Sequence, residues 1–204
     1  MKTFTVRENN IDSRAIAAAA DALAAGKIII YPTDTRYALG CNALDKKAVA
    51  RLCRLKGLDP GRNTLTIVCS SISMAADYAR IDNRTYDILR RNLPGPFTFI
   101  LPGAPSLPRT LRERRNVGIR VPANAVSAAI TEALGNPLMS TSVPDADDGS
   151  APDAAIAAML YDGVSEVALA IDSGNTPYDS HSAVVDITDA SNPKILREGP
   201  EELN

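Results

Sequence analysis

The chain has 204 residues, of which 45% are hydrophobic and 23% charged, and its net charge is −2. This length suits one well-buried domain, and the composition is that of an ordinary globular protein. No apolar run in the sequence reaches the roughly 20 residues of a membrane helix, and MKTFTVRENN has no hydrophobic signal core, so we expect a cytoplasmic protein.

The first half of the sequence alternates helical and extended patterns. Residues 11–26 predict a helix that Asp12 or Ser13 caps and that Gly26 ends. Residues 27–32 are continuously apolar and β-branched, which predicts a strand covered on both faces, followed by a polar turn. The further elements predicted here are a helix at 44–56, a strand at 64–71, short helices at 71–79 and 82–93, and a strand at 96–103.

The second half has the same alternation and ends in more closely spaced strands. Its predicted elements are a strand at 116–122, a helix at 125–135 capped by Asn124, a strand at 137–142, a helix at 151–163, strands at 167–174 and 182–188, and a closing extended segment at 194–199. This order is typical of an α/β fold with a mixed sheet and flanking helices. We expect a single domain spanning residues 1–204.

Several predicted strands end in polar side chains. These are Thr33, Asp34 and Thr35 after the first strand, Arg120 near the end of another, and Ser140, Thr141 and Ser142 at the end of a third. Ligands of open α/β sheets bind beyond the strand ends, so these groups are expected to converge on one cleft. Hydroxyls and an arginine would bind phosphate or carboxylate oxygens. Turn capping by the hydroxyls, and a surface ion pair of Arg120, are the alternatives.

The sequence offers few metal ligands or nucleophiles. Its one histidine, His181, argues against a multi-histidine metal site. The spacing of Cys41, Cys53 and Cys69 matches neither a zinc knuckle nor a redox pair, so we expect buried, apolar roles for them. The acidic segment 144–150 lacks the glutamate that closes a calcium loop, and a solvated loop is expected there. We predict no metal-ligating residues.

Charge is divided along the chain. Residues 27–120 carry 17 basic and 7 acidic side chains, whereas residues 121–204 carry 2 basic and 14 acidic ones. The basic part suggests an anionic partner such as nucleotide phosphates or RNA, and Arg109, Arg112, Arg114 and Arg115 are its densest cluster. The alternative is that the two parts neutralise each other or that the cluster is a solvated loop.

Six segments resemble one known family. YPTDTRYALGCNA, RLCRLKG, LPGPFTFIL, VGIRVP, PLMSTS and ILREG occur in the order found in the YrdC-like threonylcarbamoyl-AMP synthases, and the chain is most similar to the YciO branch. The resemblance covers roughly residues 12–200. It implies a YrdC/RibB-like (DHBP synthase-like) α/β fold, with a twisted mixed sheet around a concave surface.

The resemblance also implies a reaction and its site. L-threonine, bicarbonate and ATP, with Mg²⁺ on the nucleotide, would give threonylcarbamoyl-AMP and diphosphate for adenosine modification in tRNA. Members of the family are also associated with double-stranded RNA. By motif position, Lys56 would be the catalytic residue that withdraws charge from the phosphates. The binding residues would be Thr33, Thr35 and Tyr37 for threonine and adenylate, Arg120, Ser140 and Ser142 for ATP or AMP, and Arg197 closing over the nucleotide.

Two signatures of the family are altered. Its Lys-x-Arg reads Lys56-Gly57-Leu58 here, and its Ser-x-Asn reads Ser142-Val143-Pro144. Loss of one charge-stabilising donor typically costs about 10²–10³ in rate, so weak or altered synthase activity is expected. The alternative is a non-catalytic protein that binds nucleotide or double-stranded RNA. We hypothesise that Arg62, in the loop after Lys56, replaces the missing arginine; the alternative is that Arg62 is a solvated loop residue.

Overall fold

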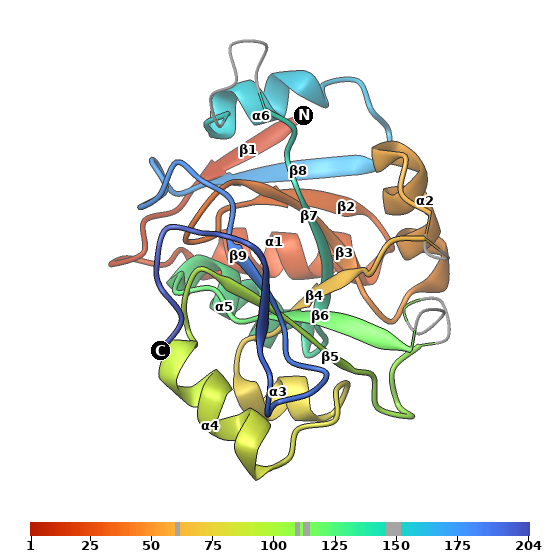
Figure 1. Ribbon diagram of the computed structural model, residues 1–204. Helices are drawn as coiled ribbons and strands as arrows, with labels where there is room; N and C mark the ends of the chain where they lie inside the picture. Colours follow the sequence, from red (N-terminus) through yellow and green to blue (C-terminus); the bar gives the residue numbers. More distant parts are fainter. Residues whose placement is uncertain (60–61, 109–110, 112–114, 146–151) are drawn as a thin grey trace.

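The computed structural model describes residues 1–59, 62–108, 111, 115–145 and 152–204 (Figure 1). The helices are α1 (Ser13–Ala24), α2 (Lys46–Lys56), α3 (Ile72–Ala76), α4 (Asn83–Asn92), α5 (Ala125–Leu134) and α6 (Ala154–Leu160). The strands are β1 (Lys2–Thr5), β2 (Ile28–Tyr31), β3 (Ala38–Asn42), β4 (Thr66–Val68), β5 (Phe97–Pro102), β6 (Asn116–Arg120), β7 (Leu138–Ser142), β8 (Val167–Asp172), β9 (Ala183–Asp186) and β10 (Lys194–Arg197).

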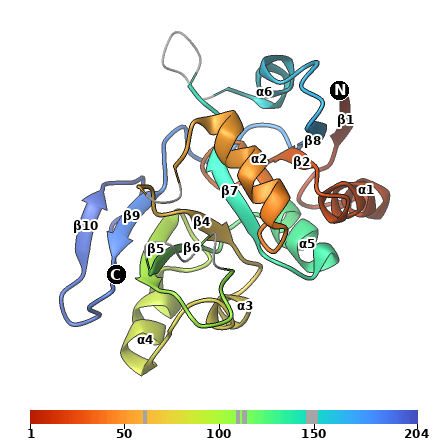
Figure 2. The same ribbon diagram turned by 90° about the vertical axis from the view of Figure 1, so that its right-hand side faces the viewer.

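These strands form one twisted sheet in the order β1-β8-β2-β3-β7-β4-β6-β5-β9-β10 (Figures 1 and 2). The pairs β1–β8, β8–β2, β4–β6 and β5–β9 are parallel, and the remaining pairs are antiparallel. The predicted mixed sheet with flanking helices is therefore confirmed. Neighbours such as β3 and β7 lie far apart in the sequence, so strands from both halves of the chain meet at the centre of the sheet.

The polar turn after Pro32 is shorter than predicted, because residues 38–42 form β3 between β2 and β7. The segment ALGCN contains Gly40, a poor strand former, which explains why its pattern did not indicate a strand. A Cβ at Gly40 would lie 2.7 Å from Cε1 of Tyr31, so glycine lets the Tyr31 ring cross over β3. The edge strand β1 was likewise not predicted.

Helices cover the two faces of the sheet unequally. On one face α2, α3, α4 and α6 pack over the larger core, which includes Leu39, Ile67 and Phe99. On the other face α1 and α5, which lie side by side in Figure 2, pack over Ile29, Tyr31 and neighbouring side chains. These two helices do not reach β5, β9 and β10, which leaves part of that face for a ligand site.

The structure confirms two smaller predictions. Asp12 caps α1 by accepting a hydrogen bond from the Arg14 amide, and all three cysteines are buried as predicted. Within the described part of the chain, no helix has the length and apolarity to cross a bilayer, and no group of three or more potential metal ligands occurs. The acidic segment 146–150, and Arg109, Arg112 and Arg114, fall outside the described residues.

Candidate functional site

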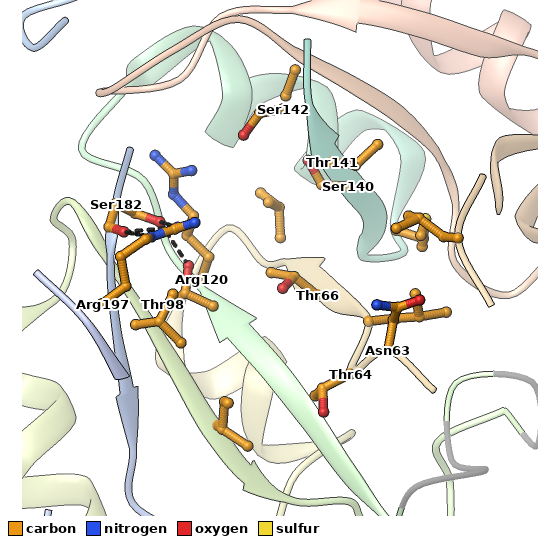
Figure 3. Close-up of a pocket in the computed structure, with 17 residues that line it drawn as sticks. Asn63, Thr64, Thr66, Thr98, Arg120, Ser140, Thr141, Ser142, Ser182 and Arg197 are labelled. Atoms are coloured by element: carbon orange, nitrogen blue, oxygen red, sulfur yellow. Dashed lines mark hydrogen bonds between the residues drawn. The ribbon is translucent and has the colours of Figure 1, made fainter. Parts of the chain in front are cut away.

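A cavity of about 300 Å³ opens on the face of the sheet that α1 and α5 leave uncovered (Figure 3). Its lining comes from seven strands and the segments beside them. The polar lining residues are Asn63, Thr64, Thr66, Thr98, Arg120, Ser140, Thr141, Ser142, Ser182 and Arg197. The apolar ones are Ala38, Leu58, Leu65, Val68, Ile100, Met139 and Val184. We call this cavity the cleft.

Arg120, the last residue of β6, supplies one positive charge to the cleft. Its Nη2 donates hydrogen bonds to Thr33 Oγ1 (3.0 Å), Asp34 Oδ1 (2.5 Å) and Thr35 Oγ1 (2.6 Å). The side chain is only 8% exposed, and its Nε is buried without a hydrogen-bond partner. A buried donor without a partner is costly, and it is the group that an anionic ligand oxygen would satisfy.

Arg197, at the end of β10, supplies a second positive charge. Its Nε and Nη2 donate to the Ser182 carbonyl oxygen at 3.0 and 2.8 Å, and Ser182 Oγ lies 3.0 Å from Thr98 Oγ1 (Figure 3). Burial and the positive charge of Arg120 lower the pKa of Arg197, and a guanidinium remains protonated in proteins at neutral pH. The guanidinium is thus oriented by a backbone carbonyl without losing its charge.

The hydroxyl wall of the cleft is built by β7, which brings Ser140, Thr141 and Ser142 together. Tyr31, fully buried beneath them, lies with its hydroxyl 2.6 Å from Ser140 Oγ. Burial raises the pKa of Tyr31 to about 12, so this phenol stays protonated and acts as a fixed hydrogen-bond partner. The wall can therefore donate to ligand oxygens without a titration near neutral pH.

Arg36 and His181, neither of which was predicted to bind substrate, lie near Arg197. Arg36 is 8% exposed and pairs with Asp145, while its Nε is buried without a partner. His181 lies next to Ser182 in the chain, and its pKa is lowered by burial and then by the charges of Arg36, Arg197 and Arg120. Three guanidiniums therefore lie near one imidazole, and Asp145 and Asp34 each form an ion pair with one of them.

The residues expected to bind substrate are only partly brought together. Arg120, Ser140, Ser142 and Arg197 line the cleft, and Thr33 and Thr35 lie behind Arg120 as its hydrogen-bond acceptors. Tyr37 instead lines a separate cavity of about 270 Å³, where its hydroxyl donates to the Gly174 carbonyl (2.7 Å). Burial raises the pKa of Tyr37 to about 12 as well.

The altered signature after α2 places an apolar side chain at the cleft. Leu58 lines it, whereas Lys56 does not; Lys56 is half-buried at the end of α2, and burial lowers its pKa. The Arg62 side chain is 88% exposed, lies 3.5 Å from Asp59, and is not one of the lining residues. The geometry therefore brings Leu58, and neither Lys56 nor Arg62, into the cleft lining.

Sequence reasoning did not single out Thr66, Thr98 or Ser182, all of which line the cleft. Each lies inside or at the end of a predicted strand, on the same face as Arg120 and Ser140. A polar residue alternating with buried apolar neighbours, as in the FTFIL segment around Thr98, was the available signal.

Comparisons with known proteins agree with this fold. The Sua5/YciO/YrdC family model, described as "Telomere recombination", matches residues 21–199. YciO of Escherichia coli K12 is 36% identical over 200 residues, covering 96% of this chain and 94% of that protein. The crystal structure of E. coli YciO superposes with a TM-score of 0.86, covering 99% of this chain and 98% of that one.

Two further relatives carry or suggest an activity in their names. The threonylcarbamoyl-AMP synthase of Alkalilimnicola ehrlichii is 34% identical, covering 86% of this chain and 90% of that protein. The crystal structure of Pyrococcus abyssi Sua5 complexed with L-threonine has a TM-score of 0.84 at 31% identity, covering 97% of this chain and 57% of that one. The matched model, the sequence identities and the shared fold together show that this chain belongs to the Sua5/YciO/YrdC family.

Proposed function

We propose that the cleft binds L-threonine, bicarbonate and Mg²⁺-bound ATP and forms threonylcarbamoyl-AMP and diphosphate, for adenosine modification in tRNA. The observation that carries the proposal is the buried, unpartnered Nε of Arg120 beside Arg197 and the hydroxyls of β7. Support also comes from the synthases in the family and from the relative whose structure contains L-threonine.

The chemistry needs positioning and positive charge more than a protein nucleophile. The threonine amine and bicarbonate would form a carbamate and release water. A carbamate oxygen would then attack the α-phosphorus of ATP, and the bond from that phosphorus to the diphosphate would break. Arg120 and Arg197 would stabilise the charge that develops on the phosphoryl oxygens, and Ser140 and Ser142 would orient them.

A slow reaction is expected because Leu58 lines the cleft where a third guanidinium would stabilise charge. The same observation favours a second candidate function, in which the cleft binds a nucleotide without turnover. Diphosphate release that depends on both L-threonine and bicarbonate distinguishes the two, since simple nucleotide binding releases no diphosphate.

We therefore predict that Leu58→Arg increases diphosphate release by roughly 10- to 100-fold, because it restores one charge-stabilising donor. The matched control is Leu58→Met, which keeps an apolar side chain of similar volume and should leave the rate unchanged. Lys56→Ala tests whether the half-buried lysine takes part, and we expect it to lower the rate. If diphosphate release is independent of threonine and bicarbonate in every variant, the synthase proposal is wrong.

We also propose tRNA or double-stranded RNA as a partner of the basic part of the chain. Arg80 and Arg115 line a second cavity of about 450 Å³, away from the cleft. Phosphate contacts release counterions, so the affinity for a short RNA duplex should fall steeply with salt and fall further in Arg80→Gln/Arg115→Gln. A filter-binding series from 50 to 200 mM salt tests this, and a flat response would contradict it.

A further inference from the structure

The two ends of the cleft differ in charge. Figure 3 shows Arg120, Arg197 and Ser182 on one side of the opening, and Asn63 and Thr64 on the other. Asp59 N donates to Asn63 Oδ1 (3.0 Å), and Asn63 N donates to Asp59 O (2.7 Å), which ties Leu58 to the Asn63 side. One end is thus cationic and the other uncharged.

The lining accommodates little negative charge. Arg120 and Arg197 are its charged residues, and Asp34 already offsets part of the charge of Arg120 at 2.5 Å. The cationic end therefore matches one phosphoryl group, held by Arg120 Nε and Arg197. Further phosphoryl groups extending along the cleft would lie against Leu58, where no guanidinium among the described lining residues compensates their desolvation.

The uncharged end suits a different part of a ligand. Leu58 offers an apolar contact, and the Asn63 amide and Thr64 hydroxyl offer neutral hydrogen-bonding groups. A few neutral polar groups in an otherwise apolar wall are typical of sites for an uncharged ring or acyl body. The cleft thus has one place for an anion and one place for a neutral group.

From this division we infer that the cleft prefers a nucleoside monophosphate ester, the class to which the acyl-adenylate product belongs, over a nucleoside triphosphate. The inference rests on the proposed function and deepens it, because it assigns the tighter complex to the product side of that reaction. Such a site retains its adenylate, so AMP competes well with ATP.

The test measures AMP, ADP and ATP binding to the full chain by titration calorimetry at one fixed Mg²⁺ concentration. AMP is expected to bind at least about tenfold more tightly than ATP, a difference of one charge-assisted contact. Leu58→Arg adds a cation at the uncharged end and should shift the AMP-to-ATP preference toward ATP by about tenfold or more. Leu58→Met should keep the wild-type preference.

The outcomes separate this inference from the proposed function. Tighter binding of ATP than of AMP by the wild-type chain overturns the inference, and diphosphate release in the same preparation would leave the synthase proposal standing. An equal shift in Leu58→Arg and Leu58→Met also overturns it, because the shift would then not depend on charge. Absence of any nucleotide binding would remove both. If Leu58→Arg has a much lower melting temperature than wild type, the inference is tested only by whether wild type binds AMP more tightly than ATP.

Discussion

Arg120 combines a structural and a ligand-binding role in one side chain. Its Nη2 compensates the nearly inaccessible carboxylate of Asp34, which also accepts from the Ala123 amide. Removing one partner of a buried ion pair typically costs about 3–5 kcal/mol, so Arg120→Ala should lower the free energy of unfolding by that amount. Urea denaturation measures it.

The control for Arg120→Ala is Arg197→Ala, which removes the other cleft cation from an edge strand whose residues are exposed. Its stability cost should be smaller, about 1–3 kcal/mol, since it leaves the carbonyl of the buried Ser182 without those hydrogen bonds. Both variants should weaken nucleotide binding. Equal destabilisation by the two would contradict the assignment of Arg120 as the partner that Asp34 requires.

His181 makes the stability of the folded protein depend on pH. Its pKa is lowered in the folded state, so the unfolded chain takes up a proton more readily once the pH falls below about 6.5. The stabilisation is complete above that pH and is lost as the pH falls through the lowered value. Wild type should therefore lose more stability than His181→Asn between pH 7.5 and 5.0 in parallel urea titrations. The difference should be modest because the His181 ring is only partly buried, and equal losses of stability in the two proteins would contradict this role of His181.

At the scale of elements, the β2–β3 pair fixes the hydroxyl wall through Gly40. Gly40→Ala would place a Cβ 2.7 Å from the fully buried Tyr31 ring, and overpacking of this kind typically costs about 1–3 kcal/mol. It should also displace the Tyr31 hydroxyl from Ser140. Tyr31→Phe removes that hydrogen bond alone, so its cost should be smaller, about 0.5–1.5 kcal/mol. Thermal denaturation of the two variants tests this order, and a neutral Gly40→Ala would contradict it.

Local patterns identified most elements, because α1, β2 and α5 each carry a cap or an apolar run of their own. They could not identify β3, whose strand conformation depends on β2 and β7 as neighbours. The polar strand ends pointed to a cleft, yet the bond between Arg120 and Asp34 joins residues 86 positions apart, which no local pattern encodes. The Arg62 hypothesis rested on its position in the sequence after Lys56, but its side chain is 88% exposed, whereas Arg36 is a buried arginine near the cleft.

At the scale of the whole molecule, the basic and acidic parts of the chain are joined at one edge of the site. The pair Arg36–Asp145 links them, whereas Arg120–Asp34 and Arg90–Asp87 lie inside the basic part. Arg36→Gln should therefore release Asp145 without unfolding the sheet. We expect weaker AMP binding with a small change in melting temperature, measured by calorimetry on one preparation. A large fall in melting temperature would instead mark Arg36 as a structural residue.

The sheet ends at β10, which pairs with β9 across a register shift between Ile195 and Arg197. Arg120 comes from the interior of the sheet, so the two cleft cations differ in how firmly the backbone holds them. Border strands open locally at a small fraction of the global unfolding cost. Fraying of this border would withdraw one cation while the rest of the domain stays native, and a bound anion would resist it. Amide deuterium uptake along β10 should therefore slow on nucleotide addition while uptake along β6 stays constant. Nucleotide affinity and the order of this edge strand would then be coupled in one equilibrium.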